Sequence, residues 1–131
     1  MKARIVLADD HEIVRKGIRS LLDGNFPWEV YAEAENGREA VDKVLELKAD
    51  LVVLDLSMPV LNGLEAAREI REAAPKTKII IFSMHDSPRI AEEAKRAGAD
   101  AYIAKTSHFT ELQNTIASLL NGTKFQANDK I

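Results

Sequence analysis

Polar side chains follow four apolar runs of the sequence, at the point where each run ends. Asp9 and Asp10 follow ARIVLA, Asp55 follows LVVL, Ser83 follows KIIIF, and Lys105 follows AYIA. Two ionised carboxylates about 4 Å apart repel by roughly 4 kcal/mol at an effective dielectric constant near 20. If the three acids lie together, a retained proton, Lys105 or a divalent cation must offset their charge. Carboxylates favour Mg²⁺ or Mn²⁺ over zinc, and bound Mg²⁺ usually keeps water and phosphate oxygens as ligands, so these residue types suit phosphoryl chemistry.

The elements that must bring these residues together alternate along the chain. Short apolar, β-branched runs are each followed by a stretch of helical period, which is typical of parallel strands linked by crossover helices. The predicted strands are residues 4–8, 28–34, 51–54, 78–82 and 101–104. We expect an α/β fold with a single doubly wound, five-stranded parallel sheet of the flavodoxin-like (βα)5 type. With the strand order 2-1-3-4-5, which is assumed, the first and third strands are neighbours and the acids share one crevice.

Apolar residues at helical spacing mark one face of each predicted helix. In the first helix the residues predicted to face the sheet are Ile13, Gly17, Ile18, Leu21 and Leu22. The last helix is expected to end at Gly122, because glycine commonly terminates helices. We therefore expect one domain over residues 1–122, with residues 123–131 as a flexible tail or the start of an interdomain linker.

Composition excludes several functional classes. The 131 residues carry a net charge of −3, so the chain has no overall basic field for tight nucleic-acid binding. There is no cysteine, which excludes disulfides and thiolate metal sites. Every apolar run is far shorter than the roughly 20 residues of a membrane span, and MKARIVLADD lacks the features of a secretory signal. We expect a soluble, cytoplasmic protein with no membrane partner.

Each of these polar residues also has an ordinary structural explanation when taken alone. Asp10 can cap a helix and Asp55 can begin a turn. Ser83 can satisfy a loop and Lys105 can be a solvated charge. Independent caps and turns do not predict complementary polar groups at the ends of four separate strands, so a shared site is favoured. The histidines show no metal-ligand spacing and are expected to be exposed: His11, His85 and His108.

Taken together, these residues resemble a CheY-like receiver domain of two-component response regulators over nearly the whole chain. The motifs of that family occur in order: the acidic pair Asp9 and Asp10, the segment DLSMPVLNG around Asp55, the hydroxyl of Ser83, the aromatic Tyr102, and Lys105. The resemblance implies that Asp55 accepts a phosphoryl group from a sensor histidine kinase or a phosphotransfer protein. It implies a signalling domain whose only chemistry is its own phosphorylation and autodephosphorylation.

The resemblance also implies a Mg²⁺ ion at the acidic residues. Asp10, Asp55 and the backbone carbonyl of Ser57 would hold the ion, and Asp9 would act mainly through a bound water. The cation would neutralise oxygen charge during phosphoryl transfer.

Three further residues receive roles from the same resemblance. Lys105 would pair with one phosphoryl oxygen, and Ser83 would donate a hydrogen bond to another. On phosphorylation, Ser83 would move towards the phosphoryl group and Tyr102 would turn inward. These movements would alter the surface formed by the fourth helix, the fifth strand and the fifth helix, which carries the output.

The sequence departs from the common pattern of the family near the site. Thr106 follows Lys105 where the broad family usually has proline, so we predict a trans peptide bond there. The segments AYIAKTS and FSMHD are similar to receivers of the NarL/LuxR-type subfamily. Met84 is expected to narrow access to Asp55. Ser57 and His85 are expected to tune dephosphorylation together with Met84.

The subfamily resemblance extends to partners outside this chain. DNA binding is expected only through a helix-turn-helix domain absent from the chain, and a homodimer through the first and fifth helices is a further expectation. Two alternatives stay open. A Mg²⁺ phosphohydrolase with an aspartate nucleophile usually has a second acid where Ser57 stands, and a flavodoxin-like binding module usually has a glycine-rich loop where this chain has ADDHE.

Overall fold

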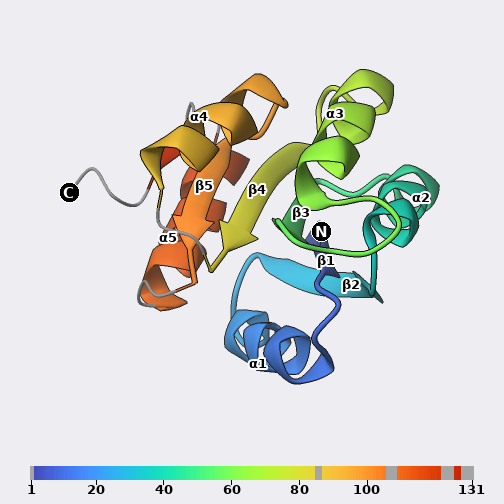
Figure 1. The fold of residues 1–131 in the computed structure, drawn as a ribbon. Helices are drawn as coiled ribbons and strands as arrows, with labels where there is room; N and C mark the ends of the chain where they lie inside the picture. The colour runs from blue at the N-terminus through green and yellow to red at the C-terminus, as the bar shows by residue number, and fades with distance from the viewer. Residues whose placement is uncertain (1, 85–86, 106–108, 122–125, 128–131) are drawn as a thin grey trace.

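Strands and helices alternate along the chain from β1 to α5 (Figure 1). This computed structural model describes residues 2–84, 87–105, 109–121 and 126–127. The strands are β1 (Ala3–Ala8), β2 (Trp28–Ala34), β3 (Leu51–Asp55), β4 (Lys78–Ser83), β5 (Ala101–Ala104) and β6 (Gln126–Ala127). The helices are α1 (Glu12–Leu22), α2 (Gly37–Leu47), α3 (Gly63–Ala73), α4 (Pro88–Arg96) and α5 (Phe109–Leu120). Within these ranges, no helix is both long enough and apolar enough to cross a membrane.

All of the paired strands run parallel, in the order β2-β1-β3-β4-β5-β6. The predicted doubly wound α/β fold and the order of its first five strands are therefore confirmed. The structure adds one strand to the predicted five, because Gln126 and Ala127 pair with Ala101 and Tyr102 at the edge of β5. An unpaired strand edge offers backbone donors and acceptors to any extended segment nearby. The domain boundary near residue 122 stays a prediction, and Gly122 itself lies outside the described residues.

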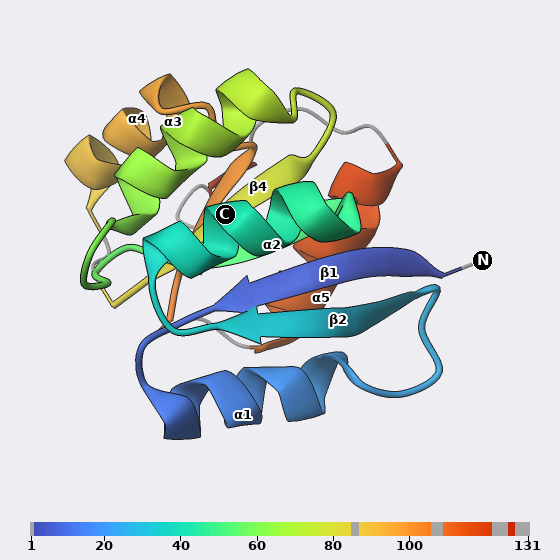
Figure 2. The ribbon, with the colours of Figure 1, turned by 90° about the vertical axis from the view of Figure 1, so that its right-hand side faces the viewer.

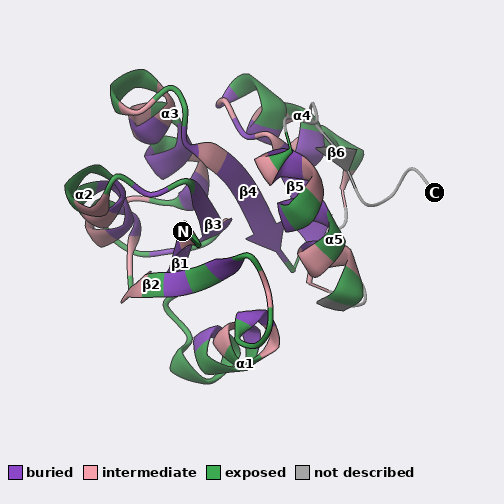
Figure 3. Cartoon of the chain, turned by 180° about the vertical axis from the view of Figure 1, so that it is seen from behind, coloured by how far each residue is buried: buried purple, intermediate pink, exposed green. Residues whose placement is uncertain are grey.

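Helices cover both faces of the sheet, as a parallel sheet requires. Figure 2 shows β1 and β2 between α1 on one side and α2 on the other. Residues of α1 and α5 belong to one core cluster, whereas residues of α2, α3 and α4 belong to the other. The central strands are buried between the two layers (Figure 3).

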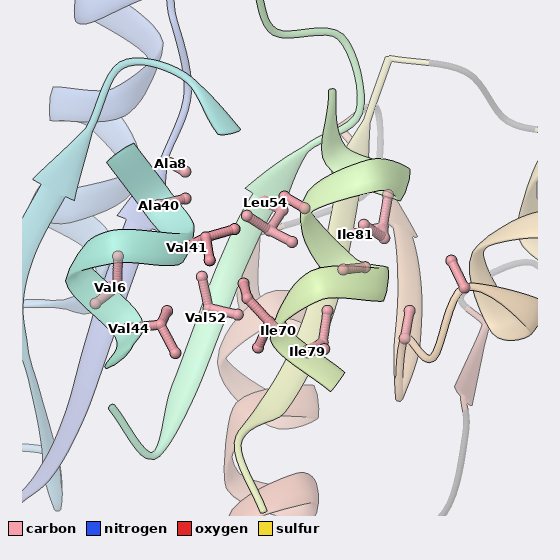
Figure 4. Close-up of a cluster of buried hydrophobic side chains, with 14 of the residues drawn as sticks. Val6, Ala8, Ala40, Val41, Val44, Val52, Leu54, Ile70, Ile79 and Ile81 are labelled. Carbon is pink, nitrogen blue, oxygen red and sulfur yellow. The ribbon is translucent and has the colours of Figure 1, made fainter. Parts of the chain in front are cut away.

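Alternation along each strand divides its side chains between the two cores. In β3, Val52 and Leu54 pack with α2 and α3, whereas Leu51 and Val53 pack with the cluster of α1 and α5. Figure 4 shows the first of these cores, where Val41 and other residues of α2 lie beside β3. A strand that is apolar on both faces is held firmly on both sides, so its carboxyl end is a rigid place for a functional group.

The apolar face of α1 differs from the prediction. Ile18 and Leu22 are buried as expected, but Ile13 is 87% exposed and Gly17 is also exposed. Arg15 is buried instead, so residues 15, 18 and 22 face the sheet. The reason is that the first turn of α1 lies beyond the apolar part of the sheet, where polar groups at the strand ends accept hydrogen bonds from a guanidinium.

Candidate functional site

The carboxyl ends of β1 and β3 bring the acidic residues together. Ala8 of β1 pairs with Leu54 of β3, so Asp9 and Asp55 each follow a paired residue on neighbouring strands. Asp9 is 1% exposed and Asp55 is 5% exposed, whereas Asp10 faces solvent. The strand order, which was an assumption from the sequence, thus places the three acids in one crevice.

Lys105 bridges the two buried acids. Its Nζ donates to Asp9 Oδ2 at 2.8 Å and to Asp55 Oδ1 at 2.9 Å. The lysine follows β5, and its backbone nitrogen donates to the carbonyl oxygen of Ser83 at 2.6 Å, which ties the end of β5 to the end of β4. The Lys105 side chain is 8% exposed, so the alternative of a solvated charge is wrong.

Burial and neighbouring charges shift the protonation equilibria of the site. Burial raises the pKa of Asp55, the ammonium of Lys105 lowers it less, and the charges of Asp9 and Asp10 raise it again. Burial lowers the pKa of Lys105, but its hydrogen bonds with Asp9 and Asp55 outweigh that effect, so the pKa is raised overall. The folded site therefore disfavours the ionised form of Asp55, mainly because the carboxylate is buried.

His11 belongs to this cluster, which the sequence analysis missed. The prediction that His11 is exposed is right, but its backbone nitrogen donates to Asp9 Oδ1 at 2.8 Å. Its Nδ1 lies 3.2 Å from Asp9 Oδ1 and 3.2 Å from Asp10 Oδ1. The sequence feature that could have predicted this contact is the position of His11 directly after Asp9 and Asp10, in the same loop before α1. His85 and His108 lie outside the described residues.

The donor set fits a hard divalent cation. Ligand atoms of Asp9, Asp10, His11 and Asp55 all lie within 4.8 Å of one another. Carboxylate oxygens are the ligands that Mg²⁺ and Mn²⁺ prefer, and a divalent cation would favour the ionised form of Asp55, which burial and the neighbouring acids disfavour. Ser57 is exposed and lines, together with Asp10, a pocket of about 560 Å³ beside the acids.

The loop after Asp55 is fixed tightly against the end of β3. A Cβ atom on Gly63 would lie 2.4 Å from the backbone oxygen of Asp55, so the start of α3 can approach the strand only because residue 63 is glycine. Asn62 and Glu65 form a reciprocal capping box, with side chain to backbone hydrogen bonds of 2.9 Å in each direction. Val60 has a φ of 69°, a strained conformation for a β-branched residue.

The other predicted residues lie around this centre. Ser83 ends β4, one position beyond Phe82, which is the register partner of Asp55, and its side chain is buried. Tyr102 of β5 is buried in the core shared with α4. Met84 is largely exposed and lines, with Lys105, a second pocket of about 560 Å³ against α1. The Lys105–Thr106 bond lies outside the described residues, so the predicted trans geometry stays a prediction.

The fold and the site define a class of protein: a doubly wound α/β domain with an acid cluster and a buried lysine at the carboxyl edge of its sheet. Comparison with known proteins specifies the family within that class. Residues 5–117 match the response regulator receiver domain, and the chain belongs to this family of two-component signalling domains.

Curated relatives agree with this assignment. Oxygen regulatory protein NreC of Staphylococcus haemolyticus is 38% identical over 123 residues, which cover 93% of this chain and 57% of that protein. Response regulator UvrY of Escherichia coli is 35% identical over 125 residues, which cover 95% of this chain and 57% of that protein. The chain therefore spans a little more than half the length of these curated relatives.

Solved structures show the same fold and subfamily. A two-component response regulator of the LuxR family from Aurantimonas sp. SI85-9A1 has a TM-score of 0.92 and 40% identity, covering 98% of this chain and 92% of that one. The signal receiver domain of the response regulator NarL from Mycobacterium tuberculosis has a TM-score of 0.88 and 30% identity, covering 93% of this chain and 98% of that one. The predicted similarity to receivers of the NarL/LuxR type is confirmed.

Proposed function

We propose that Asp55 is the phosphoacceptor of this receiver domain. A carboxylate oxygen of Asp55 attacks the phosphorus of a phosphohistidine on a sensor kinase or phosphotransfer protein. The new P–O bond forms as the P–N bond breaks, and the leaving imidazole nitrogen keeps the electron pair and takes up a proton. The observation that carries this proposal is the position of Asp55 at the end of a rigid strand, hydrogen-bonded to Lys105 and adjacent to two more acids.

A divalent cation, Mg²⁺ by its ligand preference, completes the proposed site. Asp10, Asp55 and the backbone carbonyl of Ser57 would hold it, with Asp9 acting through water. When bound, the ion neutralises charge on the oxygens of the phosphoryl group. Burial is the main cause of the raised pKa of Asp55, and a bound divalent cation would favour the ionised carboxylate that burial disfavours.

Lys105, Ser83 and Tyr102 connect the site to an output surface in this proposal. Lys105 exchanges one carboxylate oxygen for a phosphoryl oxygen, and Ser83 donates a hydrogen bond to another phosphoryl oxygen. The backbone nitrogen of Lys105 donates to the carbonyl oxygen of Ser83, so a movement of either residue on phosphorylation also moves the other. Tyr102 lies on β5 three residues before Lys105, in the core shared with α4, and passes this response to the surface of α4, β5 and α5.

We propose that three residues, Ser57, Met84 and His85, set the lifetime of the aspartyl phosphate. Ser57 and Met84 are exposed beside the site, and His85 lies outside the described residues. Met84 restricts the approach of small donors and water through the pocket that it lines with Lys105. Met84→Ala is expected to speed both labelling by a small phosphodonor and loss of the phosphoryl group, which a time course of phosphorylated protein would measure.

Labelling with a small acyl phosphate tests the central proposal. In the presence of Mg²⁺ the intact protein should gain the mass of one phosphoryl group, and borohydride reduction should convert Asp55 alone to homoserine. Chelation of Mg²⁺ or the substitution Asp55→Asn should abolish the label. Labelling of a different residue, or full labelling of Asp55→Asn, would contradict the assignment. Many turnovers on a small phosphate ester would favour the phosphohydrolase alternative instead.

An exposed apolar surface beside the site offers a place for the protein phosphodonor. Ile13 and Val14 of α1 are exposed and line the same pocket as Met84 and Lys105. Contiguous exposed apolar residues next to a reactive group are typical of a protein contact. Ile13→Ser should slow transfer from a phosphorylated kinase that labels the unmodified chain, while leaving labelling by acyl phosphate unchanged. Equal slowing with both donors would contradict this surface.

The output of the full-length protein is proposed from its relatives. A DNA-binding response regulator of the LuxR family from Staphylococcus aureus is 30% identical, with a TM-score of 0.85, and covers 91% of this chain. We infer that this receiver controls transcription in the cytoplasm through a helix-turn-helix domain outside the chain. Dimerisation through α1 and α5, which cover the same sheet face, is part of this proposal. Sedimentation with and without a beryllofluoride phosphoryl mimic would test it, and an unchanged monomer would argue against dimerisation by this receiver alone.

A further inference from the structure

A charged side chain of α1, Arg15, is buried against the end of the sheet. It is 9% exposed, in a helix whose neighbouring positions Val14 and Lys16 face solvent. Its guanidinium makes two short contacts in different directions. Nε donates to Glu33 Oε1 at 2.6 Å, and Nη1 donates to the backbone carbonyl oxygen of Asp9 at 2.7 Å. A planar guanidinium bonded on two sides has a fixed direction.

Glu33 of β2 is itself held in place. Arg19 Nη1 donates to its second carboxylate oxygen, Oε2, at 2.5 Å, and Lys43 Nζ donates to its backbone carbonyl oxygen. Burial works to raise the pKa of Glu33, but the hydrogen bonds from Arg19 and Arg15 outweigh it and lower the pKa. Glu33 is therefore an ionised and fixed anchor for Arg15.

The contact with Asp9 acts on the peptide unit that joins Asp9 to Asp10. The amide nitrogen of Asp9 donates to the carbonyl oxygen of Ala34 at 3.0 Å, so the residue is held by β2 on one side and by Arg15 on the other. Because a peptide unit is planar, fixing the carbonyl oxygen of Asp9 fixes the direction in which the chain continues to Asp10. Both carboxylates of this pair belong to the acidic cluster.

We propose that Arg15 is a positioning residue, which sets the geometry of the Asp9 and Asp10 carboxylates for a divalent cation by holding the carbonyl oxygen of Asp9. The inference rests on the proposed function, since it concerns the same cation. Removing a group that orients metal ligands typically weakens metal binding by about 10- to 100-fold. Arg15 thus supports cation binding through the backbone, from the side of the β1–α1 loop that faces β2.

Arg19 provides a matched control for this role. It pairs with the same carboxylate, Glu33, and its Nη2 donates to the carbonyl oxygen of Val30, away from the acidic pair. We would measure the Mg²⁺ dissociation constant by isothermal titration calorimetry for the unmodified chain, Arg15→Met and Arg19→Met. Urea unfolding in chelator gives the stability of each variant separately. The ¹⁵N resonance of the Asp10 amide, recorded in chelator, reports the hydrogen bond to the Asp9 carbonyl.

The expected result separates positioning from general stabilisation. Arg15→Met should weaken Mg²⁺ binding by about tenfold or more and shift the Asp10 resonance, whereas Arg19→Met should change the affinity less than about twofold. Arg15→Lys should recover only part of the affinity, because an ammonium cannot hold Glu33 and Asp9 with a fork. If Arg15→Met does not fold, Arg15→Lys supplies the same comparison against Arg19→Met.

Two results would overturn the inference. One is Mg²⁺ binding by the folded Arg15 variants within twofold of the unmodified chain, and the other is an equal loss in the Arg15 and Arg19 variants. In both of these cases the proposed function stands, because the unmodified chain still binds the cation. If the unmodified chain itself binds no Mg²⁺, the cation site of the proposed function fails and this inference fails with it.

Discussion

Replacing Asp55 with asparagine should stabilise the folded chain at neutral pH when no divalent cation is present. The change keeps the shape of the side chain and an oxygen that accepts a hydrogen bond from Lys105, but it removes one negative charge from the cluster. The sign of the effect depends on whether burial of the Asp55 carboxylate and its repulsion by Asp9 and Asp10 together outweigh its attraction to Lys105.

The distances in the site give the magnitude. Oxygens of Asp9 and Asp10 lie within 4.8 Å of an Asp55 oxygen, which corresponds to a repulsion of at least about 3.5 kcal/mol from each acid at an effective dielectric constant near 20. Lys105 Nζ lies 2.9 Å from Asp55 Oδ1, which gives about 5.7 kcal/mol of attraction on the same basis. Attraction and repulsion thus nearly cancel, and burial of the charged carboxylate, the largest cause of the raised pKa, decides the sign. Asp55→Asn should raise the free energy of unfolding by about 1–2 kcal/mol, the free energy that corresponds to a typical carboxyl pKa shift.

The pH dependence follows from the raised pKa of Asp55. A carboxyl whose pKa is higher in the folded state holds its proton more tightly there, so folding is weakened as pH rises from the ordinary aspartate value through the folded value. Below about pH 4, the ordinary aspartate range, the unmodified chain and Asp55→Asn should have similar stability. The advantage of Asp55→Asn should then grow with pH and level off once Asp55 is ionised in the folded chain.

Urea unfolding in chelator and in Mg²⁺ is the assay. Mg²⁺ at 100 times its dissociation constant should stabilise the unmodified chain by about 2.7 kcal/mol, and should stabilise Asp55→Asn much less at the same concentration. The reasoning would be refuted if, in chelator at pH 7, Asp55→Asn were less stable by 1 kcal/mol or more. That result would mean that Lys105 already compensates the acids and that the site has no electrostatic need for a cation.

Three further substitutions test neighbouring parts of the site. Lys105→Met removes the ammonium that pairs with Asp9 and Asp55 and should lower the free energy of unfolding in chelator by about 3–5 kcal/mol. Added Mg²⁺ should restore part of this stability, and no recovery would count against the idea that the lysine and the cation balance the same charges. Gly63→Ala should lower the free energy of unfolding by about 1–3 kcal/mol and weaken labelling of Asp55, because the new Cβ would meet the Asp55 backbone. The control Gly17→Ala has open space around its Cβ and should raise the free energy of unfolding by roughly 0.5–1 kcal/mol. Val60→Gly should raise the urea midpoint modestly, since relief of about 1–2 kcal/mol of left-handed strain exceeds the entropic cost of glycine.

The sequence was sufficient for the fold and for the centre of the site because both depend on short-range patterns. The β3 run is apolar at every position before Asp55, which requires burial on both faces and hence a central parallel strand. In such a sheet the carboxyl ends of neighbouring strands meet at one edge, so Asp9, Asp55 and Lys105 were predicted to converge, and they do. Strand order was the single assumption that the residues themselves did not supply.

Helical periodicity predicted the wrong buried residues in the first turn of α1. A helical pattern assigns apolar residues to the sheet side, and this rule placed Ile13 inward and overlooked Arg15. The rule holds only while the helix packs on apolar side chains, and the first turn of α1 instead meets a backbone carbonyl and the Glu33 carboxylate. A charged residue three positions before Ile18 on the helix face was the available signal. His11 was overlooked for a related reason, because adjacency along the chain, and not ligand spacing, brings it to the acids.

If Asp55 is phosphorylated as proposed, Lys105 is placed to transmit the charge change from Asp55 to the end of β5. Its Nζ joins β1 and β3 through Asp9 and Asp55, while its backbone nitrogen joins β5 to the end of β4 through Ser83. A phosphoryl group on Asp55 changes the local charge by up to about one unit and presents new acceptor oxygens to the same ammonium. A shift of the ammonium towards those oxygens would weaken its hydrogen bond with Asp9 or move the backbone of Lys105, and with it the end of β5. We therefore infer that β5 and the neighbouring α4 respond because Lys105, which balances the charge of the acids, also directly follows β5.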